Sequence, residues 1–324
     1  MSKQRTSSSR SSVTPLNEGL VVASHGRHCV VETPEGDRVI CHPRGKKLAV
    51  VVGDRVRWQP SQDEGTIEQI LPRRNLFFRQ DEVRTKSFAA NLDQVLILVA
   101  AEPEFSEHQL ARALIAAEAE HIDPLIVLNK ADLAAPFASA WKRLEPYREM
   151  GYTVMPLAAK AGNAPPLSDG LPDGDGLGSL AERLKDHTTL ILGPSGAGKS
   201  TLINRLIPGA SAQTREISLA LNSGKHTTTT TSWYWVDATR HTALIDSPGF
   251  QEFGLRHIDP MQLAAYMPDI KPHVAQCRFY NCTHIHEPGC GVIPAVKNEA
   301  GVGAISAARY RIYTTLFDEL RIQA

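Results

Sequence analysis

The alternation of hydrophobic and polar positions divides the chain into a strand-rich beginning, a middle of alternating strands and helices, and a cysteine-containing end. From Gly19, short β-rich segments are separated by turns that contain Gly, Pro and Asp. There are five such segments: GLVVAS, HCVVET, DRVICH, KKLAVVVGDRVRWQ and GTIEQIL. Short strands at this spacing predict a small closed barrel. We favour an OB-fold, although an SH3-like barrel has a similar pattern.

After a polar, basic stretch over residues 72–91, the pattern changes to apolar runs separated by helical segments. The runs are residues 94–100, 124–128, 152–157, 189–192 and 242–245. Their uniform hydrophobicity predicts strands that are buried on both faces of a parallel sheet. Between the first two runs, Leu110, Leu114 and Ala117 fall on one face of a predicted helix, which is the crossover that a βαβ unit requires.

The composition is that of a soluble, multidomain globular protein. The chain has 324 residues, 42% of them hydrophobic, and 35 Lys and Arg balance 35 Asp and Glu. Neither a secretory signal nor an apolar run long enough for a membrane span is present, so we expect a cytoplasmic protein. Residues 1–91 nevertheless carry 15 basic and 10 acidic residues, a net charge of +5. This asymmetry is compatible with nucleic-acid binding and equally with a solvated surface.

Residues 193–200, GPSGAGKS, match the phosphate-loop pattern GxxxxGK[ST] between the apolar run TTLIL and the helical segment TLINRLI. In such a loop, backbone N–H groups and the helix N-terminus surround phosphate oxygens. We expect Lys199 to reach the β- and γ-phosphates as a catalytic group, and the Ser200 hydroxyl to bind Mg²⁺. The predicted phosphate-binding residues are Gly193, Pro194, Ser195, Gly196, Ala197, Gly198, Lys199, Ser200 and Thr201.

The predicted choice of base rests on NKAD, residues 129–132, at the end of the apolar run DPLIVL. The Asp132 carboxylate can accept paired hydrogen bonds from guanine, which adenine does not offer. The alternative is that Asp132 only caps a helix. We also assign Asn129 and Lys130 to this site, together with Ala159 and Lys160, where a backbone N–H can meet the purine oxygen.

DSPG, residues 246–249, ends the strand-like segment TALI. Asp246 there can hold Mg²⁺ and the Gly249 N–H can meet the γ-phosphate, although DSPG also suits a plain turn. All four motifs follow predicted buried strands, where open α/β sheets bind ligands. Ordinary GTPases have the phosphate loop first, whereas NKAD precedes it here. The order therefore predicts a circular permutation.

The segment GKHTTTTT, residues 224–231, lies between the phosphate loop and DSPG, where a switch must supply a Mg²⁺ ligand. We choose Thr228, with Thr227 and Thr229 as close alternatives; a polar strand start is the competing interpretation. His226 is the candidate for positioning the attacking water, and a solvated loop histidine is the alternative.

Cys277, Cys282, His284 and Cys290 form a Cys₃His set within fourteen residues. Such a set suits a closed, structural Zn²⁺ site that stabilises a small domain, and His286 is an alternative ligand to His284. Trp233 and Trp235 alternate on a predicted strand and are better explained as core residues than as base-stacking groups. The barrel offers a basic group as an RNA contact: Arg44, Lys46, Lys47, Arg55 and Arg57.

These motifs in permuted order, preceded by a barrel with GDRV (residues 53–56) and followed by the Cys₃His set, closely resemble the RsgA (YjeQ/YloQ) family of small-subunit-dependent GTPases. The resemblance covers residues 17 to 320. It implies an OB-fold, a permuted GTPase domain, a zinc domain, and late maturation of the 30S subunit with subunit-stimulated GTP hydrolysis. It also implies that His226 is catalytic and that the Cys₃His set binds zinc.

We therefore expect a multidomain α/β protein with four parts: a disordered basic arm (1–16), an OB-fold RNA-binding domain (17–85), a circularly permuted P-loop GTPase domain (86–260) and a C-terminal helical zinc-binding domain (261–324). The expected partners are GTP or GDP, the 30S subunit and 16S rRNA, with no membrane, and the expected state is a monomer. A tRNA-related or translational GTPase and a GTP-switched RNA-binding module without significant turnover are the alternatives.

Overall fold

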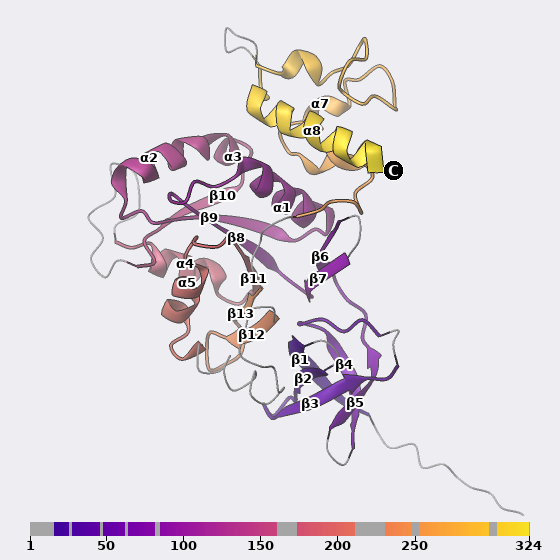
Figure 1. Cartoon of the computed structure of the whole chain (residues 1–324), viewed down its shortest axis with the longest axis vertical. Coiled ribbons are helices and arrows are strands. Elements are labelled where there is room, and N and C mark those ends of the chain that lie inside the picture. Colours follow the sequence, from indigo (N-terminus) through magenta and orange to yellow (C-terminus); the bar gives the residue numbers. More distant parts are fainter. Residues whose placement is uncertain are drawn as a thin grey trace, which may run out of the picture.

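The computed structural model describes residues 16–25, 28–45, 48–61, 64–81, 85–160, 174–210, 231–247, 253–297 and 303–323. It forms three regions in a row, with the barrel at one end, the α/β sheet in the middle and the cysteine-containing region at the other end (Figure 1). Among the residues so described, no helix combines the length and hydrophobicity needed to cross a bilayer.

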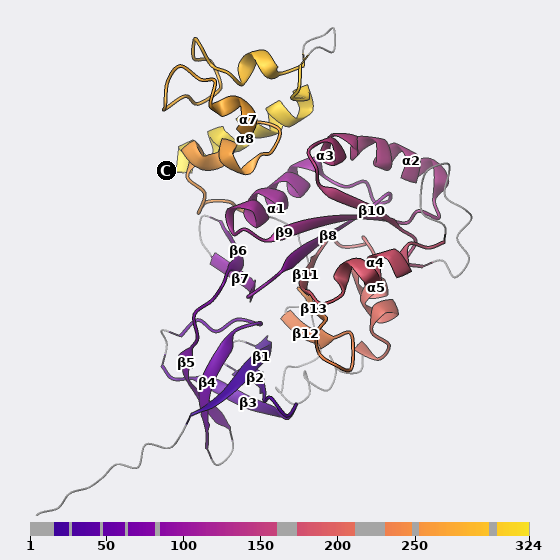
Figure 2. The ribbon, with the colours of Figure 1, turned by 180° about the vertical axis from the view of Figure 1, so that it is seen from behind.

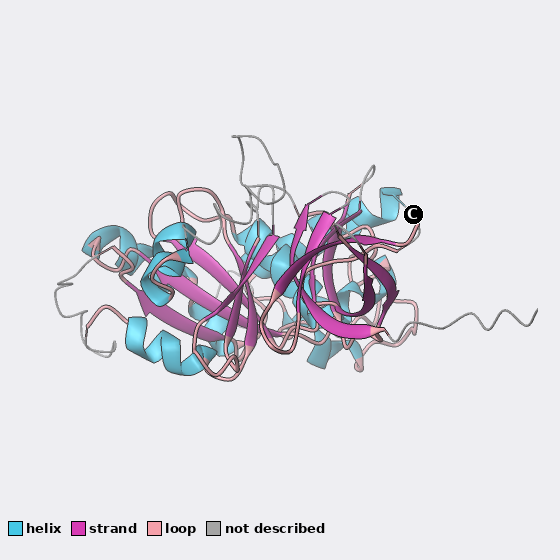
Figure 3. Ribbon diagram, turned by 90° about the horizontal axis from the view of Figure 1, so that it is seen from below, coloured by secondary structure: helices cyan, strands magenta, loops and turns pink. Residues whose placement is uncertain are grey.

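The N-terminal region is a closed five-stranded barrel, as predicted. Its strands are β1 (Asn17–His25), β2 (His28–Glu32), β3 (Arg38–Pro43), β4 (Arg55–Pro60) and β5 (Gly65–Ile70). Closure occurs because β1 pairs with both β2 and β4, while β5 pairs with β3 and β4. The alternating burial of β4, with Val56 and Trp58 inside, fits a strand that has one face in a small core. Figure 3 shows the barrel strands curving around one axis beside the flatter sheet.

The middle region is a parallel sheet in the order β10-β9-β8-β11-β13. These strands confirm the five apolar runs: β8 (Gln94–Ala100), β9 (Asp123–Asn129), β10 (Thr153–Leu157), β11 (Thr188–Leu192) and β13 (Ala243–Asp246). All seven residues of β8 are buried, as expected for a central strand covered on both faces.

Helices cover both faces of this sheet (Figure 1). One face packs against α1 (Glu107–Ala119), α2 (Ala134–Arg143) and α3 (Glu145–Glu149), and the other against α4 (Leu177–Leu184) and α5 (Lys199–Leu206). The helix α1 confirms the predicted crossover, because Leu110, Leu114 and Ala117 are all buried.

A further strand, β12 (Thr231–Trp235), joins the barrel to the sheet. It pairs antiparallel with β13 on one side and with β1 on the other, which makes one eleven-stranded sheet. Trp233 on β12 is buried, in agreement with the core interpretation, whereas Trp235 is only partly buried.

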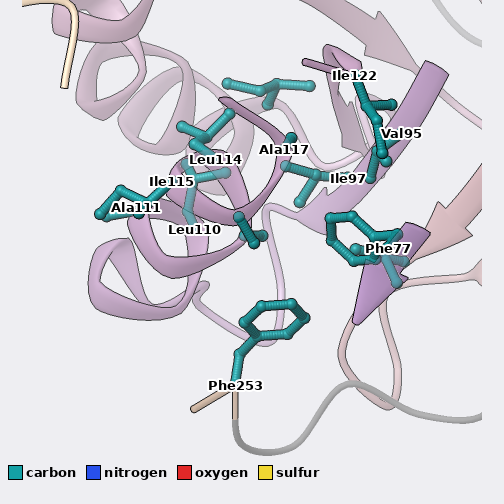
Figure 4. Close-up of a cluster of buried hydrophobic side chains, with 14 of the residues drawn as sticks. Phe77, Val95, Ile97, Leu110, Ala111, Leu114, Ile115, Ala117, Ile122 and Phe253 are labelled. Atoms are coloured by element: carbon teal, nitrogen blue, oxygen red, sulfur yellow. The ribbon is translucent and has the colours of Figure 1, made fainter. Parts of the chain in front are cut away.

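The basic stretch between barrel and sheet contains a hairpin that the hydrophobic pattern did not predict, formed by β6 (Leu76–Gln80) and β7 (Thr85–Ala90). Its Phe77 and Phe88 rings pack against Phe253, with centroids 5.5 and 6.1 Å away. Phe77 and Phe253 lie beside the apolar residues of α1 (Figure 4). The hairpin thus anchors the segment that follows DSPG.

The C-terminal region consists of short helices and loops held by one long helix. It contains η1 (Pro260–Tyr266), α7 (Lys271–Val274), η2 (Ile293–Ala295) and α8 (Ala307–Gln323). The α8 helix, with 17 residues, supplies the helical character predicted for this region. Figure 2 shows α8 lying close to α1, and apolar residues of both helices belong to one continuous core.

Candidate functional site

Three of the four predicted nucleotide motifs line one cavity of about 670 Å³ at the carboxyl ends of the parallel strands. Asp132 and Lys199, which are 67 positions apart in the printed sequence, both line it. The lining consists of Asn129, Lys130, Asp132, Leu133, Ala159, Lys160, Gly193, Pro194, Ser195, Gly196, Gly198, Lys199, Ser200 and Thr201. Among these only Leu133 was not predicted. Ala197, which was predicted, is fully buried within the loop and does not line the cavity.

Asn129 holds the motifs together from behind the cavity. Its side-chain Nδ2 donates to the carbonyl oxygen of Ala197 in the phosphate loop at 2.7 Å. Its Oδ1 accepts from the backbone N–H of Ala159 at 2.9 Å. The side chain is buried, so both bonds are shielded from water and fix the relative positions of three loops.

The phosphate loop has the backbone shape that its glycines allow. Gly198 has φ of 98° and precedes Lys199, the first residue of α5. A side chain at this position would be strained by the left-handed backbone, and its Cβ would lie 2.3 Å from Asn129 Nδ2. The loop therefore places the amide-bearing start of α5 against the cavity, where it attracts anions.

Asp132 does not act as the helix cap that was its alternative role. Leu133 occupies the N-cap position of α2 and no side-chain cap bond is made there. The Asp132 Oδ1 is buried and accepts no hydrogen bond from any residue that the structure describes. A buried carboxylate oxygen without a donor is rare in native proteins, and this one lines the cavity, where a guanine base offers donors.

Lys199 and Asp246 meet directly. The Lys199 Nζ donates to the Asp246 carboxylate and to the carbonyl oxygen of Ser247. Ser247 is itself fixed by a 2.9 Å bond from its Oγ to the Ile191 carbonyl. The predicted phosphate-binding cation and the predicted Mg²⁺-binding carboxylate are therefore adjacent, and they neutralise each other.

The donor set near Lys199 fits Mg²⁺, because the Ser200 hydroxyl and Asp246 carboxylate are hard oxygen ligands. The remaining predicted switch residues, His226, Thr227, Thr228, Thr229 and Gly249, lie outside the described residues.

The Cys₃His set converges as predicted. The ligand atoms of Cys277, Cys282, His284 and Cys290 all lie within 4.8 Å of one another. His284 Nδ1 is 3.4 Å from Cys277 Sγ and 3.6 Å from Cys290 Sγ. His286, the alternative ligand, is exposed and is not part of the cluster. Three thiols and one imidazole at this separation suit tetrahedral Zn²⁺.

Surrounding groups prepare the cluster for a cation. The backbone N–H groups of Gly291 and Val292 donate to the sulfurs of Cys277 and Cys290, at 3.2 and 3.3 Å. Such donors stabilise thiolates. Burial lowers the pKa of His284, which favours the neutral imidazole that metals bind.

The cluster is also tied to α8 and to an internal carboxylate. Tyr310 and Tyr313 donate to the carbonyl oxygens of His284 and Thr283, at 2.8 and 2.9 Å. Burial opposes ionisation of Glu287, but hydrogen bonds from Thr283 and from nearby backbone N–H groups lower its pKa to about 2. The sequence motif did not reveal these supporting residues, because none of them is a ligand.

The comparisons with known sequences agree with this geometry. The family model described as RsgA GTPase matches residues 70–256. The small ribosomal subunit biogenesis GTPase RsgA of Variovorax paradoxus (strain S110) is 68% identical over 305 residues, covering 94% of this chain and 93% of that protein. The protein of the same name from Burkholderia pseudomallei (strain K96243) is 50% identical over 304 residues, covering 93% of this chain and 92% of that protein.

Two solved structures share the architecture along nearly the whole chain. The crystal structure of YjeQ from Thermotoga maritima matches with a TM-score of 0.70 and 31% identity, covering 94% of this chain and 99% of that chain. The crystal structure of YloQ, a circularly permuted GTPase, matches with a TM-score of 0.66 and 26% identity, covering 98% of this chain and 99% of that chain. With a family model over more than half of its length and such relatives over nearly all of it, the chain belongs to the RsgA GTPase family.

Proposed function

We propose that this protein hydrolyses GTP to GDP and phosphate during late maturation of the 30S ribosomal subunit, and that the subunit stimulates the reaction. The observation that carries the proposal is the single cavity lined by both Asp132 and Lys199. The named function of the relatives, small ribosomal subunit biogenesis, supports the choice of partner.

In this proposal the protein contacts both the guanine base and the phosphates of GTP. The Asp132 carboxylate accepts from guanine N1–H and N2–H₂, and the Ala159 and Lys160 segment faces the purine oxygen. The phosphate loop and the start of α5 hold the phosphates, and Lys199 stabilises the negative charge that develops when water attacks the γ-phosphate.

Lys199 must exchange Asp246 for phosphate oxygens when GTP binds. Asp246 and Ser200, with Thr228, are then the proposed Mg²⁺ ligands, and that ion supplies further charge neutralisation at the phosphates. We assign the positioning of the attacking water to His226, and contact with the γ-phosphate to the Gly249 N–H. The ammonium–carboxylate pair thus keeps two catalytic groups close to their working positions.

The proposed rRNA contacts lie at the two ends of the molecule. Arg55 and Arg57 are exposed on the outer face of β4. Arg44, which directly follows β3, is also exposed. Lys46 and Lys47 lie outside the described residues. A cationic surface of this kind binds the RNA backbone.

At the other end, the metal-binding loop presents two aromatic rings. Tyr280 is fully exposed, Phe279 is 43% exposed, and the Arg278 guanidinium lies over the Phe279 ring. Glu287 is the one acidic residue between positions 270 and 297, and its carboxylate is occupied by internal hydrogen bonds. An exposed tyrosine on a positively charged loop suits stacking on an unpaired base.

The test combines phosphate release and co-sedimentation with purified 30S subunits. We expect slow hydrolysis by the protein alone, stimulation by 30S, and co-sedimentation that the Tyr280→Ala variant weakens. Absence of turnover with 30S would favour a GTP-switched RNA-binding module, and preferential binding of mature tRNA would favour a tRNA-related GTPase.

The same samples, analysed by light scattering, test the proposed monomer, and cell fractionation tests the proposed cytoplasmic location.

The domain division also remains part of the proposal, with an arm over 1–16, an RNA-binding barrel over 17–85, a GTPase domain over 86–260 and a zinc domain over 261–324. The metal is proposed to be one Zn²⁺, held by the Cys₃His set.

A further inference from the structure

A second cavity, of about 820 Å³, lies where the barrel, the segments on either side of the β6–β7 hairpin and the sheet meet. It is separate from the guanine cavity and shares no lining residue with it. Its wall carries four arginines and two tryptophans: Arg55, Arg73, Arg74, Arg240, Trp233 and Trp235. No step of GTP hydrolysis uses these residues.

The cavity walls are held by hydrogen bonds and are not a loose gap between domains. The buried Asp54 carboxylate accepts two bonds from Arg73, at 2.7 and 2.8 Å. The Asn91 side chain accepts from the Arg74 N–H at 2.8 Å and donates to the Gly53 carbonyl at 2.9 Å. Gly53 packs so closely that an added Cβ would lie 2.2 Å from the Ala90 carbonyl oxygen. The GDRV motif therefore builds one wall of this cavity.

The wall also holds two acidic residues, Asp93 and Asp186, and the Asp186 carboxylate lies 3.9 Å from His241. The arginines of the wall are unevenly compensated. Arg73 is paired with Asp54, and Arg74 with Asp93 at 2.8 Å. Arg55 has no carboxylate partner within the described part of the chain. Arg240 reaches Glu32 only at 3.6 Å, and Glu32 is already bound by Arg38 and by the Trp235 ring N–H. The cavity thus offers guanidinium groups that can bind an anion.

The tryptophans add a flat apolar surface beside these guanidinium groups. Trp235 is held in place by its 2.7 Å bond to Glu32 and meets Trp233 edge-on, with ring centroids 5.1 Å apart. Trp233 is 4% exposed, and its Nε1–H is buried without an acceptor among the described residues. A buried donor of this kind calls for a ligand or a water at the wall.

We propose that this cavity binds one nucleotide of a single-stranded RNA, with the base against Trp235 and the phosphate between Arg55 and Arg240. Aromatic rings next to guanidinium groups recognise a base and its phosphate together, and the volume lies within the range of small-ligand sites. An inorganic anion alone would leave the tryptophan surface unused. RNA is favoured over a free nucleotide because Arg57 follows Arg55 on the same exposed face of β4. Arg57 is 3.5 Å from Glu18 and extends the basic surface away from the cavity.

This inference rests on the proposed function only in its choice of RNA as the source of the nucleotide. The experiment uses the full chain with GDP bound at the guanine site. The probe is a short single-stranded RNA that carries one 5-iodouridine for photo-crosslinking, and affinity is measured by fluorescence anisotropy at a fixed salt concentration. Cross-linked peptides are mapped by mass spectrometry.

We expect a cross-link to the peptide that contains Trp233 and Trp235. We also expect the double variant Arg55→Ala, Arg240→Ala to lower RNA affinity roughly tenfold and to reduce the salt dependence of binding. The matched control is Arg183→Ala, which removes a surface arginine of α4 that is paired with Asp123 of β9. This variant should leave the affinity within about twofold of that of the unmodified chain. Thermal unfolding checks that each variant is folded.

Cross-links confined to other peptides, with unchanged affinity of the double variant, would overturn the proposal. Displacement of the cross-link by AMP, at concentrations that leave GDP bound, would overturn the assignment to RNA and indicate a free nucleotide. Stimulation of GTP hydrolysis by 30S is measured on the same preparation. If 30S does not stimulate hydrolysis by the unmodified chain, the proposed function is contradicted. The cross-link result tests RNA binding in the second cavity independently.

Discussion

The Asn129 side-chain amide lies 2.7 Å from the Ala197 carbonyl oxygen, so the first residue of NKAD is bonded to the middle of the phosphate loop. The same side chain also accepts from Ala159. These two hydrogen bonds make the base-binding and phosphate-binding parts of the cavity one rigid unit, although 68 positions separate Asn129 from Ala197 in the chain.

We predict that Asn129→Ala weakens GDP binding and lowers the free energy of unfolding by about 2 to 4 kcal/mol, because it leaves a buried carbonyl and a buried N–H without partners. The comparison variant is Asn129→Asp, which keeps the acceptor for Ala159 and places an oxygen against the Ala197 carbonyl. Calorimetric binding and urea denaturation measure both effects. Unchanged GDP affinity in both variants would show that the Asn129 hydrogen bonds do not determine the shape of the nucleotide site.

Asp132 has a buried carboxylate oxygen that no group of the described chain satisfies. We predict that Asp132→Asn reduces GTP affinity about a hundredfold, because it loses charge-assisted bonds to guanine, and that xanthosine triphosphate becomes the preferred nucleotide. The fold should be unaffected, since the replaced oxygen accepts no hydrogen bond from the protein. Retained preference for GTP would place the base elsewhere.

The Cys₃His cluster predicts that the purified chain holds one zinc ion. Cys282→Ser should lower the zinc content and destabilise α8, because Tyr310 and Tyr313 donate to carbonyl oxygens in the loop that carries the Cys₃His set. The matched control is Cys29→Ala, a buried cysteine of the barrel that is outside the cluster. Elemental analysis and thermal unfolding are the measurements, and equal zinc content in the two variants would contradict the assignment.

His257 lies against Phe78, with ring centroids 4.3 Å apart. Both of its ring nitrogens are buried and have no hydrogen-bond partner in the part of the chain that the structure describes. Burial lowers its pKa from 6.5 to about 4. Between pH 6.5 and 4 the unfolded chain binds a proton at His257 that the folded chain does not bind. The free energy of unfolding therefore falls as the pH drops through this window. Below it His257 is protonated in both states, and its contribution no longer changes with pH.

The expected size of this effect is at most about 3 kcal/mol. We predict that His257→Phe, which keeps the ring packing, makes the free energy of unfolding less dependent on pH between 6.5 and 4. Urea denaturation at a series of pH values measures the slope. An unchanged slope would assign the acid sensitivity to other groups.

Arg112 on α1 connects the segment after DSPG to the last helix. Its guanidinium donates to the Phe253 carbonyl at 3.2 Å and to the Glu319 carboxylate on α8. We expect hydrogen exchange across residues 253–297 to differ between the GDP and GTP-analogue states, and Arg112→Ala to reduce that difference. Arg148→Ala, which removes an arginine stacked on Trp141, is the control. Identical exchange in the two nucleotide states would exclude this coupling.

Residues whose chemistry is visible in short motifs were predictable. The phosphate loop, NKAD and the Cys₃His set each have a spacing that local backbone geometry dictates, and strands such as β8 have an unambiguous apolar pattern. The β6–β7 hairpin was not predictable because polar residues interrupt its apolar positions and its phenylalanines find their partner, Phe253, far along the chain. The hydrogen-bond partners of Asn129 and Arg112 were also not predictable, because tertiary packing sets them.

The pairing of β1 with β12 has a practical consequence for dissecting this protein. A truncation that begins after the barrel would strip β12 of its neighbour and leave its backbone N–H and C=O groups as an open sheet edge. Such a fragment would be prone to self-association, and its inactivity would report aggregation instead of a lost domain function. The proposed GTP hydrolysis and RNA binding should therefore be separated with point variants of the intact polypeptide.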